Sequence, residues 1–172
     1  MTKPSILVAE DEGALVTLLR YNLEREGYRV FEARDGEEAL LLADEVKPDL
    51  VVLDWMLPQL SGIEVCRRLR GRGHMRNVPI VMLTGHTSLE RVHQARDAGI
   101  NEFLAKPVSS KNLLGRLVSV IEHPRPFVRA RCYFGPCRRR RRNDEYHGPE
   151  RRSGLNALVD PKKSSAEAYA TV

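Results

Sequence analysis

The sequence predicts an α/β domain in which five parallel strands form one sheet and helices cover both of its faces. Three observations lead to this prediction. Apolar runs of strand length alternate five times with segments whose apolar residues have helical spacing. The runs are almost continuously apolar, as expected of strands buried on both faces of a parallel sheet. Turn-forming residues such as Gly27 and Pro48 separate the segments. Together they predict a doubly wound sheet with right-handed crossovers.

The first two units each combine a strand with a helix. The apolar run Ser5–Ala9 is expected to be a strand, and the leucines of Ala14–Glu26 have helical spacing up to the stop at Gly27. Tyr28–Ala33 is expected to be the second strand. Gly36–Glu45 follows as a helix, because its alanines and leucines have helical spacing.

The next two units follow Pro48. Leu50–Asp54 is expected to be a strand that ends in an aspartate, and Ser61–Arg70 a helix with apolar residues at helical intervals. Ile80–Thr84 and Leu89–Ala98 are expected to form the fourth strand and helix.

The fifth unit consists of a short strand at Glu102–Ala105 and a helix at Ser110–Glu122. His123–Pro126 cannot continue this helix, since proline lacks the amide donor and disfavours helical geometry in the residue before it. We therefore expect a folded domain at residues 1–123. Residues 124–172 have few apolar periodicities, and we expect them to be an arginine-rich linker and a disordered tail.

Composition excludes several classes of protein. Of the 172 residues, 42% are hydrophobic and 30% are charged, which fits a globular protein with a polar appendage and excludes collagens and coiled coils. The longest apolar runs are far shorter than a membrane span or the core of a signal peptide, so we expect a cytoplasmic protein without a membrane span. Three unevenly spaced cysteines indicate free thiols rather than a disulfide framework or a zinc site.

The charge is concentrated in one segment. Residues 1–123 contain 16 Lys and Arg against 18 Asp and Glu, whereas residues 124–152 contain 10 Arg against 3 acidic residues. The run Arg138–Arg142 lies in that segment, close to aromatic residues. Three interpretations stay open: contact with an acidic protein surface, which includes the chain's own domain, binding to nucleic acid, or a solvated tail.

Polar residues follow the expected strands at the edge where such sheets carry their functional sites. Glu10 and Asp11 follow the first strand, Asp54 ends the third, Thr84 ends the fourth and Lys106 follows the fifth. If the first and third strands are neighbours, the carboxylates repel one another unless a cation lies between them. Oxygen ligands favour Mg²⁺, and the full set suits phosphoryl transfer, in which a carboxylate can be the nucleophile.

Five motifs, in this order, resemble the receiver domain of response regulators in two-component signalling systems. They are Glu10-Asp11, Asp54 after an apolar strand, Met56-Leu57-Pro58 with Ser61-Gly62, Thr84-Gly85, and Lys106-Pro107. The resemblance covers residues 5 to 122 and implies a flavodoxin-like (βα)5 fold. The first half is similar to receivers of the phosphate-regulon, winged-helix type, and the second half looks more like single-domain receivers. Only 49 residues follow position 123, so we expect no winged-helix output domain.

The resemblance implies roles for individual residues. Asp54 is implied to be the phosphoacceptor. Glu10, Asp11 and Asp54 are implied to bind Mg²⁺ together with the backbone carbonyl of Met56. Lys106 is implied to contact the phosphoryl group.

A switch is implied as well. Thr84 and Phe103 are the pair that would reorient on phosphorylation and change the face made by the fourth helix, fifth strand and fifth helix. A downstream protein partner is expected at that face. A homodimer is also possible there, through charged pairs such as Glu102 with Arg116.

The function expected on this basis is that of a phosphorylation-dependent response regulator. A sensor histidine kinase or a histidine phosphotransfer protein would donate the phosphoryl group, and the chain would be no enzyme beyond its own phosphorylation and dephosphorylation. Two alternatives stay open: a receiver that regulates nucleic-acid binding by the arginine-rich tail, and a phosphate shuttle or sink.

Two classes of enzyme fit the sequence poorly. A phosphatase of the haloacid-dehalogenase type needs a second aspartate two residues after the nucleophile, where this chain has Met56. A dinucleotide oxidoreductase needs a G-x-G-x-x-G motif after the first strand, and the acidic segment Glu10–Gly13 stands there instead.

Overall fold

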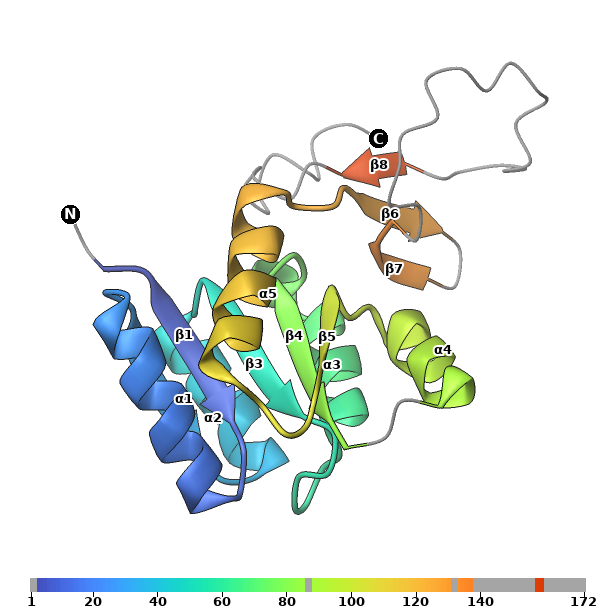
Figure 1. Ribbon diagram of the computed structural model, residues 1–172. Helices are drawn as coiled ribbons and strands as arrows, with labels where there is room; N and C mark the ends of the chain where they lie inside the picture. Colours follow the sequence, from blue (N-terminus) through green and yellow to red (C-terminus); the bar gives the residue numbers. More distant parts are fainter. Residues whose placement is uncertain (1–2, 86–87, 131–132, 138–156, 160–172) are drawn as a thin grey trace.

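The computed structural model describes residues 3–85, 88–130, 133–137 and 157–159. Its centre is a five-stranded parallel sheet with the strand order β2-β1-β3-β4-β5, and helices cover both faces (Figure 1). The strands are β1 (Ser5–Ala9), β2 (Arg29–Ala33), β3 (Leu50–Asp54), β4 (Ile80–Thr84) and β5 (Glu102–Ala105). The helices are α1 (Gly13–Arg25), α2 (Gly36–Val46), α3 (Gly62–Gly71), α4 (Leu89–Ala98) and α5 (Ser110–Glu122), with a short 3-10 helix, η1 (Gly73–Met75), after α3. The predicted fold class is confirmed.

Alternate residues of each central strand enter two separate hydrophobic cores, one on each face of the sheet. In β3, Val51 and Leu53 pack with α2, α3 and α4, whereas Leu50 and Val52 pack with α1 and α5. All residues of β3 are buried because helices cover both sides. This double burial explains why the strand reads as a continuous apolar run in the sequence.

The loops that follow the strands meet at one edge of the sheet. Between β3 and α3 the chain turns so tightly that a Cβ atom on Gly62 would lie 2.1 Å from the carbonyl oxygen of Asp54. Only glycine allows this approach. The side chain of Ser61 accepts a hydrogen bond from the N–H of Glu64 and caps the first turn of α3. The turn therefore holds Asp54 at the carboxyl edge of the sheet.

The segment after α5 differs from expectation. Strands β6 (Phe127–Ala130), β7 (Tyr133–Pro136) and β8 (Ala157–Val159) form a second, antiparallel sheet in the order β7-β6-β8. The expectation of disorder from residue 124 onward does not hold for these strands, because Phe127 is fully buried and its ring contacts that of Phe134 at 5.4 Å between centroids. Arg138–Arg142 lies outside the described residues, so the three interpretations of that run stay open.

No helix in the described part of the chain is long and apolar enough to cross a membrane.

Candidate functional site

Three carboxylates lie together at the carboxyl edge of the sheet. Glu10 follows β1, Asp54 ends the neighbouring strand β3, and one carboxylate oxygen from each of Glu10, Asp11 and Asp54 lies within 4.8 Å of the other two. Glu10 is fully buried and Asp54 is 3% exposed, whereas Asp11 is exposed. Burial places like charges in a medium of low effective dielectric, so their repulsion is stronger than it would be in water. The predicted proximity of β1 and β3 is confirmed.

Lys106 offsets part of this charge. Its Nζ atom lies 2.8 Å from Oε2 of Glu10 and 3.1 Å from Oδ1 of Asp54. Burial alone would lower the pKa of the Lys106 ammonium, but the two carboxylates outweigh this effect and raise the pKa above its ordinary value. Lys106 is therefore charged and bridges the two buried carboxylates.

At Glu10 the effect of burial on the pKa outweighs that of the charged lysine. Burial raises the pKa of the Glu10 carboxyl, the contact with Lys106 lowers it, and the neighbouring Asp54 carboxylate raises it further, so that the overall shift is upward. The N–H of Glu12 donates a hydrogen bond to Oε1 of Glu10 at 3.2 Å. The single lysine therefore does not compensate fully for the burial of this carboxylate.

The cluster has the features of a site for a divalent cation. Oε2 of Glu10 is buried and accepts no well-directed hydrogen bond from the described residues, although Lys106 lies at ion-pair distance. An ion could use this oxygen together with those of Asp11 and Asp54. Hard oxygen ligands of this kind, with one exposed side for water, are those that Mg²⁺ prefers. The donor set therefore fits Mg²⁺.

The remaining predicted residues lie on β4, on β5 and in the loop after β3. Thr84 is buried at the end of β4 and pairs in register with Ala105, which precedes Lys106. Phe103 lies in the middle of β5, is half-buried, and packs against the core formed with α2, α3 and α4. The side chain of Met56 is exposed two residues after Asp54. The roles of these three residues stay predictions.

Sequence reasoning missed one contact near the site. The guanidinium of Arg91, in the first half of α4, lies over the ring of Trp55 at 5.2 Å from its centroid. Trp55 directly follows Asp54 and is largely buried. A cation over an indole ring is attractive, so the pair connects α4 to the loop that carries Asp54. No local pattern in the sequence indicates this pairing.

This arrangement can support nucleophilic chemistry on a phosphoryl group. Asp54 presents a buried carboxylate, and Lys106 supplies a positive charge that could stabilise incoming phosphoryl oxygens. Phosphoryl transfer depends mainly on positioning and on neutralising charge, and the cluster provides both. A groove of about 550 Å³ opens beside Lys106.

Comparison with protein families gives a match to one family model. Residues 6–118 match the model described as the response regulator receiver domain. This range includes Glu10, Asp11 and Asp54 of the carboxylate cluster as well as Thr84 and Lys106, and it ends before β6.

Two curated regulators illustrate the similarity in sequence. The chain is 43% identical over 125 residues to the phosphate regulon transcriptional regulatory protein PhoB of Rhizobium meliloti, covering 73% of this chain and 55% of that protein. It is 47% identical over 116 residues to the alkaline phosphatase synthesis transcriptional regulatory protein PhoP of Bacillus subtilis, covering 67% and 48%. The chain thus spans about half the length of the curated relatives it matches.

Solved structures agree with the fold. The chemotaxis protein CheY4 of Vibrio cholerae superposes with a TM-score of 0.67 at 29% identity, covering 69% of this chain and 99% of that one. The receiver domain of a sensor histidine kinase from Pseudomonas aeruginosa gives 0.65 at 31% identity, covering 70% and 99%, and its structure has a magnesium ion coordinated in the active site cleft.

Proposed function

This chain belongs to the response regulator receiver family, and we propose that it works as a phosphorylation-dependent switch whose phosphoacceptor is Asp54. The observation that carries the proposal is the position of Asp54. It is buried at the end of β3, within 4.8 Å of two further carboxylates and 3.1 Å from the ammonium of Lys106. Phosphorylation-dependent switching is typical of the family.

The proposed transfer is a single displacement at phosphorus. A carboxylate oxygen of Asp54 forms a bond to phosphorus while the bond from phosphorus to the donor's imidazole nitrogen breaks. The electron pair of that bond stays on the nitrogen. Lys106 keeps its proton throughout and stabilises negative charge on the phosphoryl oxygens, which its raised pKa favours.

Glu10 and Asp11 would hold a Mg²⁺ ion together with Asp54, and the Met56 carbonyl is the further ligand that we propose. When bound, this ion supplies positive charge for the phosphoryl oxygens and relieves the repulsion among the carboxylates. The residues of the chain fix where that charge lies, because the buried Glu10 has little freedom to move.

We further propose that Thr84 and Phe103 transmit the change. Thr84 ends the strand next to β3, and its hydroxyl would donate to a phosphoryl oxygen. Phe103 is half-buried, and its ring would move between exposed and packed positions. The face of α4, β5 and α5 would then bind the downstream partner.

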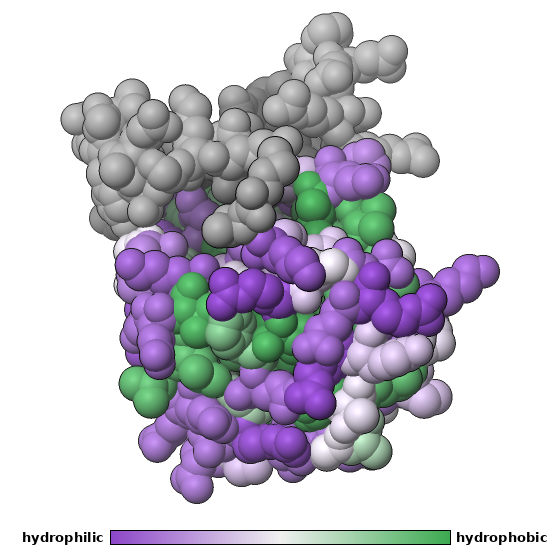
Figure 2. Space-filling model, turned by 90° about the vertical axis from the view of Figure 1, so that its left-hand side faces the viewer, coloured by the Kyte–Doolittle hydropathy of each residue, from purple (hydrophilic) through white to green (hydrophobic). Residues whose placement is uncertain are grey.

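The groove beside Lys106 supports a protein donor such as a sensor histidine kinase or a histidine phosphotransfer protein. It is lined by Glu12, Ala14, Leu15, Leu18, Lys106, Pro107 and Val108. Figure 2 shows the side of the molecule on which α1 lies, where a small group of hydrophobic residues is surrounded by hydrophilic ones. Leu18 of α1, which lines the groove, is 39% exposed. A donor helix could bury such residues while its phosphohistidine reaches Asp54.

A pair of variants tests the donor surface. With a sensor kinase that phosphorylates the native chain, Leu18→Asp should slow transfer without changing labelling by a small-molecule donor. Leu41→Asp, at an exposed leucine on α2, is the matched control and should change neither. Equal rates for both variants would contradict a donor surface at α1.

The function itself is tested by intact mass. The native chain, incubated with acetyl phosphate and Mg²⁺, should gain one phosphoryl group, and Asp54→Ala should gain none. Asp44→Asn removes a carboxylate that Arg72 and His74 contact far from the cluster, and should label like the native chain. A native chain that folds but takes no label, or an Asp54→Ala variant that labels normally, would refute the proposal.

The two residues of the predicted dimer contact already pair with each other within one chain. Glu102 pairs within the same chain with Arg116 at 3.4 Å and with Arg125 at 3.0 Å. Dimerisation through the Glu102 and Arg116 pair therefore stays a prediction, and it would require these contacts to be exchanged.

A further inference from the structure

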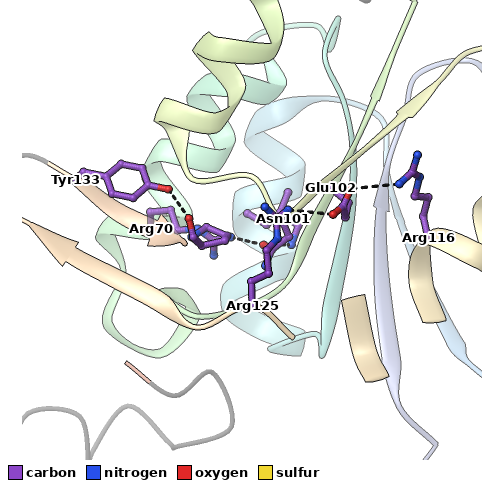
Figure 3. A network of polar contacts seen from close by, with 8 residues as sticks. Arg70, Asn101, Glu102, Arg116, Arg125 and Tyr133 are labelled. Carbon is purple, nitrogen blue, oxygen red and sulfur yellow. Dashed lines mark hydrogen bonds and ion pairs between the residues drawn. The ribbon is translucent and has the colours of Figure 1, made fainter. Parts of the chain in front are cut away.

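The segment that follows α5 packs on the receiver domain at two places. Residues 124–130 and 133–137, here called the strap, lie beyond the range that matches the receiver family. They include β6 and β7, and Figure 3 shows the polar network that connects them to the receiver. Strap residue Cys137 donates its N–H to the carbonyl of Pro126 at 2.7 Å, which closes the hairpin.

The first contact is centred on Arg70, near the end of α3. This arginine is 5% exposed, and its guanidinium lies over the ring of strap residue Phe127 at 5.1 Å from the centroid. It also donates hydrogen bonds to the carbonyl of Gly99 at 2.9 and 3.0 Å and to Oδ1 of Asn101 at 2.9 Å. The same side chain thus holds the strap, the end of α4 and the start of β5.

A second arginine strengthens this contact. Arg76 lies 3.8 Å from the centroid of the Phe134 ring in β7. The backbones approach closely as well, since a Cβ atom on Gly135 would lie 2.8 Å from the Cα of Gly99, and one on Gly99 would lie 3.0 Å from the carbonyl oxygen of Phe134. No side chain is present between the two glycines, so a shift of α4 would break this fit rather than be absorbed by a rotamer change.

The second place is the first residue of β5. Arg125 of the strap lies 3.0 Å from Glu102, which is 9% exposed and directly precedes the switch residue Phe103. Asn101, on the other side of Glu102, accepts hydrogen bonds from Arg70 and from the N–H of Ile80 at the start of β4. The strap therefore contacts the residue before Phe103, at the beginning of β5, as well as the end of α4.

We infer that the strap is a regulatory element of this chain, and that its docking on α4 and β5 opposes the rearrangement that follows phosphorylation of Asp54. This inference rests on the proposed function. The strap fits the conformation in which Lys106 contacts Asp54, and movement of α4 or Phe103 would weaken that fit. Because coupling between two sites is reciprocal, a loosened strap must also favour the phosphorylated conformation by the same factor.

Hydrogen exchange on the full chain tests whether occupation of the Asp54 site loosens the strap. Beryllium fluoride with Mg²⁺ mimics a phosphoryl group on a carboxylate, and it should accelerate exchange of strap amides, including that of Cys137. We expect at least about a fivefold increase, the lower end of ordinary allosteric coupling. Intact mass after acetyl phosphate, measured on the same preparation without beryllium fluoride, reports independently whether Asp54 is reactive.

The outcomes separate the two proposals. If the chain takes no phosphoryl label, the proposed function and the strap inference both fail. If it takes the label but strap exchange stays unchanged on loading with beryllium fluoride, the switch stands and the strap inference alone is overturned.

A matched pair of variants tests the opposite direction, in which a loosened strap favours the phosphorylated conformation. The two arginines that contact Glu102 provide this pair. Arg125→Ala releases the strap from Glu102, whereas Arg116→Ala removes the arginine that belongs to α5. Fluorescence of Trp55, the only tryptophan in the sequence, can report beryllium fluoride binding next to Asp54. Arg125→Ala should raise that affinity at least about fivefold, and Arg116→Ala should raise it less.

Phe134→Ala, which removes the ring under Arg76, should act like Arg125→Ala. Equal affinities for the native chain and both strap variants would overturn the inference.

Discussion

Charge is buried at both edges of the central sheet, but hydrogen bonds occupy the buried group fully at only one of them. At the carboxyl edge, Glu10 is fully buried, and its Oε2 atom accepts no well-directed hydrogen bond from the described residues. At the amino edge, Arg70 is also buried, yet it donates to the carbonyls of Arg76, Val78 and Gly99 and to Asn101.

We interpret the carboxyl edge as a site that can bind a ligand and the amino edge as a contact that stabilises the fold. Carbonyl and amide oxygens accept hydrogen bonds from the N–H groups of Arg70, so these donors are used within the structure. Crowded carboxylates with one lysine keep binding capacity for a cation and a phosphoryl group, at a cost in stability. We therefore expect variants at the amino edge to change stability and variants at the carboxyl edge to change binding.

The largest effect is expected for Arg70. Arg70→Ala would leave several buried carbonyl oxygens without donors, so the free energy of unfolding should fall by about 3 kcal/mol or more, measured by urea denaturation. Arg68→Ala is the matched control, because Arg68 makes an exposed pair with Glu64 on the same helix, and it should change stability by less than about 1 kcal/mol. Similar losses for both variants would remove the distinction between the edges.

Magnesium binding should depend on the carboxylates at the other edge. Asp11→Asn should weaken Mg²⁺ binding at least about tenfold, because even the loss of a residue that only orients a metal ligand lowers metal affinity by that factor. The fluorescence of Trp55 can follow this binding. Glu12→Gln, at an exposed neighbour outside the cluster, should have a smaller effect. An unchanged affinity in Asp11→Asn would contradict the proposed ligand set.

The same titration should depend on pH. Burial raises the pKa of Glu10, so this carboxylate takes up a proton at a higher pH than an ordinary glutamate does. Mg²⁺ requires the deprotonated form, and its affinity should therefore decrease as the pH is lowered through this raised pKa. In Glu10→Gln the remaining affinity should lose that part of the pH dependence.

The smallest expected effect concerns Cys66, which lies beside the amino edge. Its thiol donates to the carbonyl of Ala98 at 3.2 Å, and burial raises its pKa to about 11 from an ordinary value of 9.0. The unfolded thiol loses its proton first as pH rises, so the stability contribution is present below pH 9 and is lost toward pH 11.

Denaturation measures this loss directly. Between about pH 8 and about pH 10 the native chain should lose about 1 kcal/mol more stability than Cys66→Ala does. Equal losses in the two chains would indicate that the thiol is less enclosed than the structure describes.

The sequence predicts the receiver part of the fold well because buried parallel strands are easy to recognise. β1, β3, β4 and β5 begin and end at the expected residues. The acidic cluster and Lys106 were also predictable, since the carboxyl ends of parallel strands meet at one edge.

The amino edge and the strap were harder to predict. Arg70 lies four residues after Cys66 and seven after Ile63, so it shares their apolar face of α3, and this spacing was the available signal. Strands β6 and β7 are short and owe their position to arginines of the receiver that stack on Phe127 and Phe134. Such contacts between distant segments leave no local pattern.

The central claim is that Asp54 itself carries the phosphoryl group. Borohydride reduces an aspartyl phosphate to homoserine, so the chain can be treated with acetyl phosphate and Mg²⁺, reduced, digested and analysed by peptide mass spectrometry. We predict homoserine at position 54 in the native chain, dependent on Mg²⁺ and absent from the control without phosphodonor. Reduction at a different aspartate, with residue 54 unmodified, would contradict the account.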